Sequence, residues 1–174
     1  MGKYFGTDGI RGVVNVELDG HLAFKVGRAV AYALSQQSNH RAKILIGKDT
    51  RISSDMLEAA LTAGICSSGA DVESLGVIPT PAVAHLTIKH MADAGIVISA
   101  SHNPYEHNGI KIFAGSGYKL SDELEARIEE YIDRVDDLPR ATHDKIGRVL
   151  PLEMDPIEEY TNYLAETIPG DLSG

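Results

Sequence analysis

The chain has 174 residues, of which 43% are hydrophobic and 24% are charged, and its formal net charge is −9 at pH 7. This length suffices for one well-packed domain with an additional element. The negative charge argues against general binding to nucleic acid or to an anionic membrane surface, and no apolar run approaches the length of a membrane span. The single cysteine, Cys66, cannot form an internal disulfide, which favours a reducing cytoplasm.

The spacing of apolar residues predicts that helices and strands alternate along the chain. In the first half we expect a helix capped by Asp19, a strand over 43–46 ending at Gly47, a helix opened by Ser53 or Ser54 and stopped at Gly69, and a strand over 72–77. A short helix over 82–90 follows, and then strands over 94–98 and 110–113. The rest of the chain should form a helix after Ser121, a short strand over 148–150 and a final helix over 157–168.

Many of the acidic residues of this chain lie between Asp122 and Asp144, in a segment that begins with a helical pattern. Its apolar positions recur every three to four residues: Leu120, Leu124, Ile128, Ile132 and Val135. Ser121 can cap the N-terminus of this helix, and Asp122 and Glu123 suit the helix dipole there. A solvated helix face therefore explains these carboxylates better than a metal site does.

The alternation predicts a three-layer α/β/α domain with a mixed, mostly parallel sheet. The close spacing of the strands over 94–98 and 110–113 suggests that one of them is antiparallel. We expect this domain to cover residues 1–150. Residues 151–174 are interpreted as a linker and the first helix of a truncated second domain, and residues 170–174 match no element.

The most informative segment is a polar loop between two apolar strands. It contains Ser99-Ala100-Ser101-His102-Asn103-Pro104 and, shortly afterwards, Asn108-Gly109-Ile110-Lys111. Buried strands on both sides would fix the geometry of a serine, a histidine, two asparagines and a lysine. Asn103 before Pro104 and Asn108 before Gly109 predict turns that fold the loop back on itself. A plain hairpin connection would need neither the histidine nor the lysine.

These residues resemble the active-serine loop of the α-D-phosphohexomutase family. Two further segments match that family in the same order, Tyr4-Phe5-Gly6-Thr7-Asp8-Gly9-Ile10-Arg11-Gly12 and Gly47-Lys48-Asp49-Thr50-Arg51. The resemblance covers roughly the first 120 residues. Within the family, the N-terminal segment and the serine loop are most similar to those of the bacterial phosphoglucosamine mutases.

The resemblance implies a phosphosugar mutase that works through a phosphoserine. Phosphorylated Ser101 would donate its phosphoryl group to one hydroxyl of a hexosamine phosphate, and the bisphosphorylated sugar would return the other phosphate to Ser101. The transition state spreads negative charge over the transferred oxygens, so catalysis is mostly positioning and electrostatics. Family members hold Mg²⁺ on the serine phosphate with aspartates of the second domain, so Ser101 is the expected metal contact, through its phosphate.

The resemblance assigns catalytic roles to Ser101, Lys111, Arg11 and His102. Ser101 is the expected nucleophile, although a serine can also cap a turn. His102 would position phosphate, or it could be an ordinary loop histidine. Lys111 would stabilise charge or transfer a proton, although a lysine at the start of a strand is often a surface residue. The planar guanidinium of Arg11 suits a phosphoryl group, with a structural pair to Asp8 as the alternative.

Other motif residues have weaker indications. The resemblance implies substrate or phosphate binding for Thr7, Asp8, Asn103 and Asn108, while the two asparagines could simply shape the loop. Asp49 and Arg51 could contact substrate directly, or pair with each other and brace their loop. The motif loops concentrate cations, including Lys48, in an otherwise acidic chain, as a phosphorylated small substrate would require.

Several other motifs do not carry a function. Gly47-Lys48 lacks the spacing of a P-loop, and Gly115-Ser116-Gly117 is a turn rather than a hydrolase nucleophile elbow. His85 and His90 have helical spacing but no evident set of carboxylate or cysteine partners, so we do not expect zinc.

The leading interpretation is an N-terminal fragment of an enzyme that interconverts glucosamine 6-phosphate and glucosamine 1-phosphate, for amino-sugar nucleotide synthesis in bacterial cell-wall formation. We expect the fragment to be inactive alone, to reside in the cytoplasm, and to have no nucleic-acid or membrane partner. The alternatives are phosphomannomutase or phosphoglucomutase activity, or a non-catalytic phosphosugar-binding module. The final helix could also drive association into a homodimer.

Overall fold

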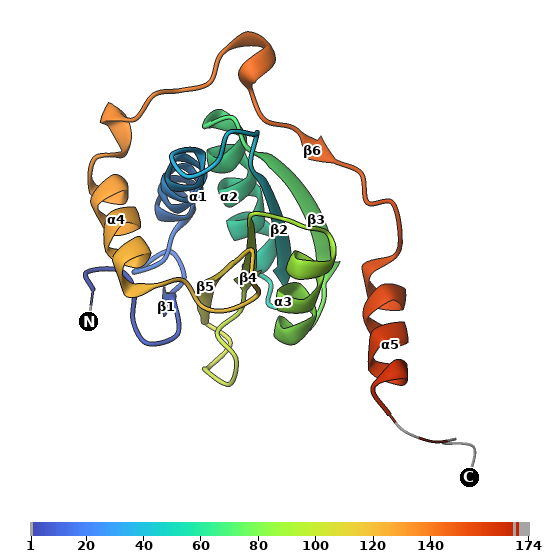
Figure 1. The fold of residues 1–174 in the computed structure, drawn as a ribbon. Helices are drawn as coiled ribbons and strands as arrows, with labels where there is room; N and C mark the ends of the chain where they lie inside the picture. The colour runs from blue at the N-terminus through green and yellow to red at the C-terminus, as the bar shows by residue number, and fades with distance from the viewer. Residues whose placement is uncertain (1, 169, 171–174) are drawn as a thin grey trace.

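A six-stranded sheet forms the centre of the computed structural model, which describes residues 2–168 and 170 (Figure 1). The strand order is β1-β5-β4-β2-β3-β6. The strands are β1 Ile10–Val13, β2 Lys43–Lys48, β3 Asp71–Val77, β4 Ala94–Ile98, β5 His107–Ala114 and β6 Val149–Leu150. Only β5 runs against its neighbours, because it pairs antiparallel with both β4 and β1 while the other pairs are parallel.

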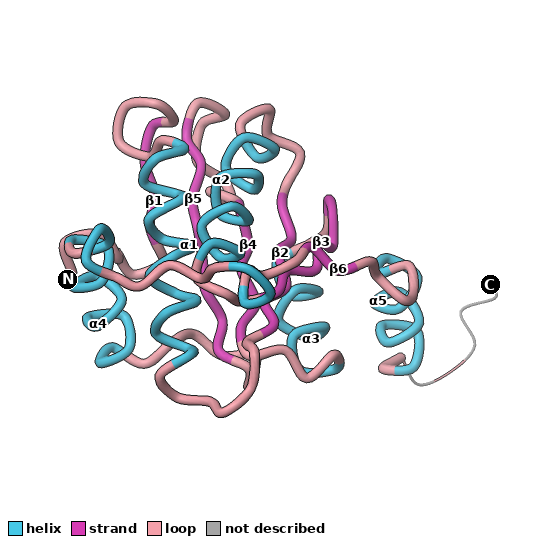
Figure 2. Tube along the Cα trace, turned by 90° about the horizontal axis from the view of Figure 1, so that it is seen from above, coloured by secondary structure: helices cyan, strands magenta, loops and turns pink. Residues whose placement is uncertain are grey.

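Helices cover both faces of the sheet, which confirms the predicted three-layer α/β/α arrangement with a mixed, mostly parallel sheet (Figures 1 and 2). The helices are α1 Gly20–Ser35, α2 Ser54–Ser67, α3 Thr80–Lys89, α4 Asp122–Asp133 and α5 Pro156–Glu166, with short 3-10 turns at Val135–Asp137 and His143–Lys145. Ile44 and Ile46 point into the core shared with α1, α2 and α4, whereas Leu45 between them packs toward α3. This alternation is the period of a strand buried on both faces.

Local sequence signals set the ends of the helices as expected. The Asp19 carboxylate accepts a hydrogen bond from the Leu22 backbone nitrogen at 2.7 Å, and the Ser121 hydroxyl accepts one from Leu124 at 3.3 Å. These side chains replace the partners that the first turn of a helix lacks. The capping predictions for α1 and α4 are therefore confirmed.

One strand was not predicted, and two local predictions are wrong. The N-terminal segment contains a strand, β1, which the sequence did not indicate because Arg11 and Gly12 separate its two apolar residues. Asn108-Gly109 forms no turn: both residues lie inside β5, paired with β1. Helix α3 begins at Thr80 rather than at residue 82, because Pro81 is tolerated within the first helical turn.

The segment after α4 crosses from one edge of the sheet to the other. It adds β6 in parallel to β3 and continues into α5, which lies at the opposite end of the molecule from α4 (Figures 1 and 2). The buried Glu159 carboxylate of α5 bonds to His90 at 2.8 Å and to Lys89 at 2.9 Å, which ties α5 to the end of α3. Residues 171–174, for which no element was expected, lie outside the described residues. Within the described part of the chain, every helix is too short or too polar to cross a membrane.

Helices α1 and α2 approach each other through two glycines. A Cβ atom at Gly64 would collide with the Phe24 backbone carbonyl, and one at Gly27 would collide with the Leu61 carbonyl. Each clash involves backbone, so neither helix could accommodate a methyl group without moving.

We predict that Gly64→Ala lowers the free energy of unfolding by about 1–3 kcal/mol, because the added methyl group overpacks this contact. Urea unfolding of the 174-residue chain measures the change. Gly20→Ala is the matched control: a Cβ there meets only the Ala60 side chain at 3.8 Å, so its stability should stay the same or rise. Equal effects of the two substitutions would contradict the account.

Candidate active site

The polar loop lies where the carboxyl ends of β2 and β4 meet. The backbone nitrogen of Asp49, just after β2, donates to the carbonyl of Ile98 at the end of β4 at 2.9 Å. The chain then turns at Ser101, whose φ is +55°, in the left-handed region that L-residues seldom adopt. The Ser101 backbone nitrogen donates to the Ser99 hydroxyl at 3.0 Å. Strained backbone of this kind is often found at functional sites.

Lys111 and Ser101 are brought into contact by the pairing of β4 with β5. Lys111 lies opposite Val97 in this antiparallel pair, so the loop between the two strands folds back over the lysine. The Lys111 Nζ donates a hydrogen bond to the exposed Ser101 Oγ at 2.9 Å. Partial burial, and then the neighbouring Arg11 charge, lower the pKa of Lys111 below its usual 10.5. The site thus pairs an accessible hydroxyl with a partly desolvated amine.

Arg11 approaches the same place from β1. It lies opposite Gly109 of β5, and its guanidinium pairs with the Asp8 carboxylate at 3.0 Å. The structural pair considered from the sequence is therefore present. Thr7 and Asp8 are exposed, and both line a cavity of about 270 Å³ that also contains Lys111. The N-terminal segment that carries Thr7 and Asp8 thus lies next to Lys111, about 100 residues later in the sequence.

The other residues of the loop have different environments. The His102 side chain is exposed next to Ser101, and that of Asn103 is half-buried. Asn108 is fully buried: its side-chain nitrogen donates to the hydroxyls of Ser53 at 2.9 Å and Ser54 at 3.1 Å. The buried amide of Asn108 thus joins β5 to the start of α2, and this structure gives it no solvent-facing surface.

The Asp49 and Arg51 side chains pair, as one of the two sequence interpretations proposed. Arg51 Nε donates to the Asp49 carboxylate at 3.0 Å, and its backbone nitrogen donates to the same group. Burial alone would raise the pKa of Asp49, but hydrogen bonds from Arg51, Ser99 and Ser54 lower it. What the sequence did not reveal is that the rest of the Arg51 guanidinium reaches the serine loop.

Lys48 contributes little free positive charge to the site. Its ammonium group pairs with Asp55 at 2.6 Å and also with Glu58, both on α2. His90 likewise has partners that the sequence did not indicate, because Glu73 and Glu159 both contact its ring. The expectation that His90 lacks carboxylate partners is therefore wrong. No group of three or more histidine, cysteine or carboxylate side chains among the described residues could hold a metal ion.

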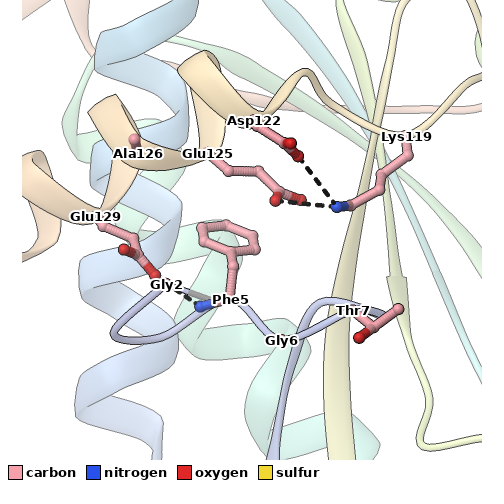
Figure 3. A pocket seen from close by; sticks show the side chains of 9 residues that line it. All are labelled: Gly2, Phe5, Gly6, Thr7, Lys119, Asp122, Glu125, Ala126 and Glu129. Carbon is pink, nitrogen blue, oxygen red and sulfur yellow. Dashed lines mark hydrogen bonds and ion pairs between the residues drawn. The ribbon is translucent and has the colours of Figure 1, made fainter.

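A second cavity of about 430 Å³ adjoins the site but excludes Ser101 (Figure 3). Its lining residues come from the N-terminal segment, from α4 and from Lys119 just before that helix. Glu129 accepts hydrogen bonds there from the backbone nitrogens of Tyr4 and Phe5, at 2.6 and 2.7 Å. Lys119 pairs with Glu125 at 3.1 Å and with Asp122 at 3.7 Å. The Glu129 hydrogen bonds hold the segment that carries Thr7 against α4.

We predict that NMR titration of Lys111 in the 174-residue chain gives a pKa below 10.5, and that Arg11→Met moves it upward. Because the folded pKa is the lower one, the unfolded chain binds more protons between the two values. The contribution of Lys111 to stability therefore rises with pH across that window. The control is Arg134→Met, which changes an exposed residue that pairs with Glu130 of α4. It should leave the pKa of Lys111 unchanged. A pKa that is insensitive to Arg11→Met would contradict this electrostatic account.

Comparison with known proteins agrees with this arrangement. Residues 2–138 match the family model described as phosphoglucomutase/phosphomannomutase, alpha/beta/alpha domain I. The phosphoglucosamine mutases of Acetivibrio thermocellus and Ruminiclostridium cellulolyticum are 57% and 56% identical to this chain over its whole length, and the chain spans 39% of each.

The fold is also found in solved structures. A phosphoglucomutase/phosphomannomutase family protein from Burkholderia thailandensis superposes with a TM-score of 0.74 at 24% identity, over 91% of this chain and 34% of that one. Parafusin, a phosphoglucomutase from Paramecium, gives a TM-score of 0.72 at 16% identity, over 97% and 35% respectively. These two likenesses concern the fold alone. On the family match and the identity to curated relatives, the chain belongs to the phosphoglucomutase/phosphomannomutase family and contains its α/β/α domain I.

Proposed function

We propose that this chain is the part of a phosphosugar mutase that carries its phosphoserine, acting on glucosamine 6-phosphate and glucosamine 1-phosphate. The observation that carries the proposal is the contact of Lys111 Nζ with the exposed Ser101 Oγ at 2.9 Å. The choice of sugar rests on the names of the relatives that are 57% and 56% identical. No observation favours phosphomannomutase or phosphoglucomutase activity over this proposal.

In the proposed reaction, Ser101 exchanges a phosphoryl group with the sugar. The bond between phosphorus and the phosphoserine oxygen breaks, a bond from phosphorus to a sugar hydroxyl oxygen forms, and the sugar hydroxyl proton ends, in net terms, on the freed Ser101 oxygen. The bisphosphorylated sugar then reorients, and Ser101 Oγ receives the other phosphoryl group. Lys111 lies within hydrogen-bond distance of the serine oxygen on which charge changes, so its ammonium group would stabilise that charge.

The remaining site residues would bind the phosphate groups. Arg11, whose charge acts on Lys111, and the exposed His102, which follows Ser101 in the chain, would position a phosphoryl group. Thr7 and Asp8 border the cavity next to Lys111, where a sugar phosphate would enter, and Asn103 lies on the serine loop. Asn108 would act through the loop instead, since it is buried.

The described residues do not by themselves make a Mg²⁺ site, because they contain no suitable group of carboxylates. A phosphate on Ser101 would supply hard oxygen ligands of the kind that Mg²⁺ prefers, and the remaining ligands would have to come from outside this part of the chain. When bound, Mg²⁺ would offset negative charge on the phosphoryl group.

The chain spans 39% of its curated relatives, so the proposed activity belongs to a longer protein. We propose that residues 1–150 form the domain with the active serine, that residues 151–174 lead into the next domain, and that the protein works in the cytoplasm. The 174-residue chain alone should have negligible mutase activity, because a sugar that turns over must be held at both ends.

We predict that Ser101→Ala in the full-length protein lowers mutase turnover by at least about 10⁴-fold, since no other group replaces the phosphoryl carrier. Turnover is measured as conversion of glucosamine 6-phosphate to glucosamine 1-phosphate, with urea unfolding to show that the fold is intact. Ser116→Ala, which changes an exposed serine in the turn after β5, is the control and should keep full activity. Retained turnover in Ser101→Ala would remove Ser101 from the nucleophile role.

A further inference from the structure

Arg51 makes a set of hydrogen bonds that encloses its guanidinium in the serine loop. Its Nη1 donates to the carbonyl oxygens of Pro104 at 2.7 Å and His107 at 3.1 Å. Its Nη2 donates to those of Ser101 at 3.0 Å and Asn103 at 2.9 Å. The side chain is only 12% exposed. The loop that carries the serine therefore wraps around this one cation.

No donor of the Arg51 side chain is left for a substrate. A guanidinium has five N–H groups, and the fifth, on Nε, bonds to Asp49 at 3.0 Å. Arg51 comes from the loop after β2, whereas three of the carbonyls belong to the loop after β4 and the fourth to His107, the first residue of β5. The side chain thus joins two loops that are about 50 residues apart in the sequence.

The contact with the Ser101 carbonyl acts on the backbone of the proposed nucleophile itself. Ser101 has a φ of +55°, which an L-residue adopts only under constraint from its surroundings. Four carbonyl dipoles that point to one centre would repel one another without a cation between them. Arg51 removes that repulsion and keeps the Ser101 side chain outward, toward Lys111 Nζ at 2.9 Å.

We propose that Arg51 is a positioning residue, which holds the backbone of residues 101–107 in the shape that presents the Ser101 hydroxyl to Lys111 and to the incoming phosphoryl group. This rests on the proposed function of Ser101. Lysine cannot replace it, because an ammonium group has three donors on one atom and lacks the planar fork. Asp49 completes the device by fixing the orientation of the guanidinium from the opposite side.

The test compares Arg51→Lys with Arg41→Lys in the full-length protein. Arg41 is the matched control: it precedes β2, pairs with Asp71, and donates to the carbonyls of Asp144 at 2.7 Å and Ile146 at 3.1 Å, at the other end of the strand. Arg51→Lys should lower kcat by about 100-fold while KM changes less than about threefold, because the loss is in positioning. Arg41→Lys should leave both constants unchanged.

Hydrogen exchange gives a second readout that does not depend on activity. The backbone nitrogens of Asn103 and His107 donate within the loop at 3.1 and 3.0 Å, so their exchange should quicken in Arg51→Lys and stay slow in Arg41→Lys. Asp49→Asn is a second variant, which keeps Arg51 but weakens the hydrogen bonds that orient its guanidinium. Like Arg51→Lys, it should lower kcat and quicken exchange, each by about tenfold.

Several outcomes would overturn the proposal. Unchanged kcat and exchange in Arg51→Lys would show that the loop keeps its shape without the fork. A raised KM with unchanged kcat would make Arg51 a substrate contact, and faster exchange throughout the domain would make it a general structural residue. If the unaltered protein lacks mutase activity, the proposed function fails, while exchange at Asn103 and His107 still decides whether Arg51 holds the loop.

Discussion

The contact between Lys111 and Ser101 depends on the antiparallel pairing of β4 with β5. Placing Lys111 opposite Val97 lets the loop that follows β4 return over the lysine, so an amine and a hydroxyl ten residues apart meet at 2.9 Å. A slip of one residue in this register would turn the lysine to the other face of the sheet. Strand β4 is buried throughout, and β5 buries Ile110 and Ile112, so packing of the core fixes the register and, through it, the site.

The charges near the site divide into those that hold structure and those that are available to a ligand. The Lys48 ammonium is neutralised by two carboxylates, and the Arg51 guanidinium is used up by Asp49 and four carbonyls. The Arg11 guanidinium pairs only with the exposed Asp8 carboxylate among the described side chains, and the Lys111 ammonium group contacts the neutral Ser101 hydroxyl. In a chain of net charge −9, these last two are the cations best placed to meet a phosphorylated ligand.

The sequence was most informative where local chemistry decides the structure. Asp19 and Ser121 mark helix starts because a cap needs only a short polar side chain next to a helical segment. Strand β1 was missed because its pairing with β5 comes from residues about 100 positions away. Asn108-Gly109 was mistaken for a turn since those residue types favour one, yet burial against Ser53 and Ser54 keeps Asn108 in a strand. The Arg51 hydrogen bonds to the serine loop and the Glu159–His90 contact were not predicted either, because they also join residues that are far apart in the sequence.

The central claim is that Ser101 carries the phosphoryl group. Intact mass spectrometry with phosphosite mapping, on the protein isolated from its own cells, tests this most directly. We expect a chain longer than 174 residues with one phosphate on Ser101, since the relatives extend well beyond this chain. A protein that bears no phosphate at Ser101 and ends at residue 174 would contradict the mutase function and favour a phosphosugar-binding module.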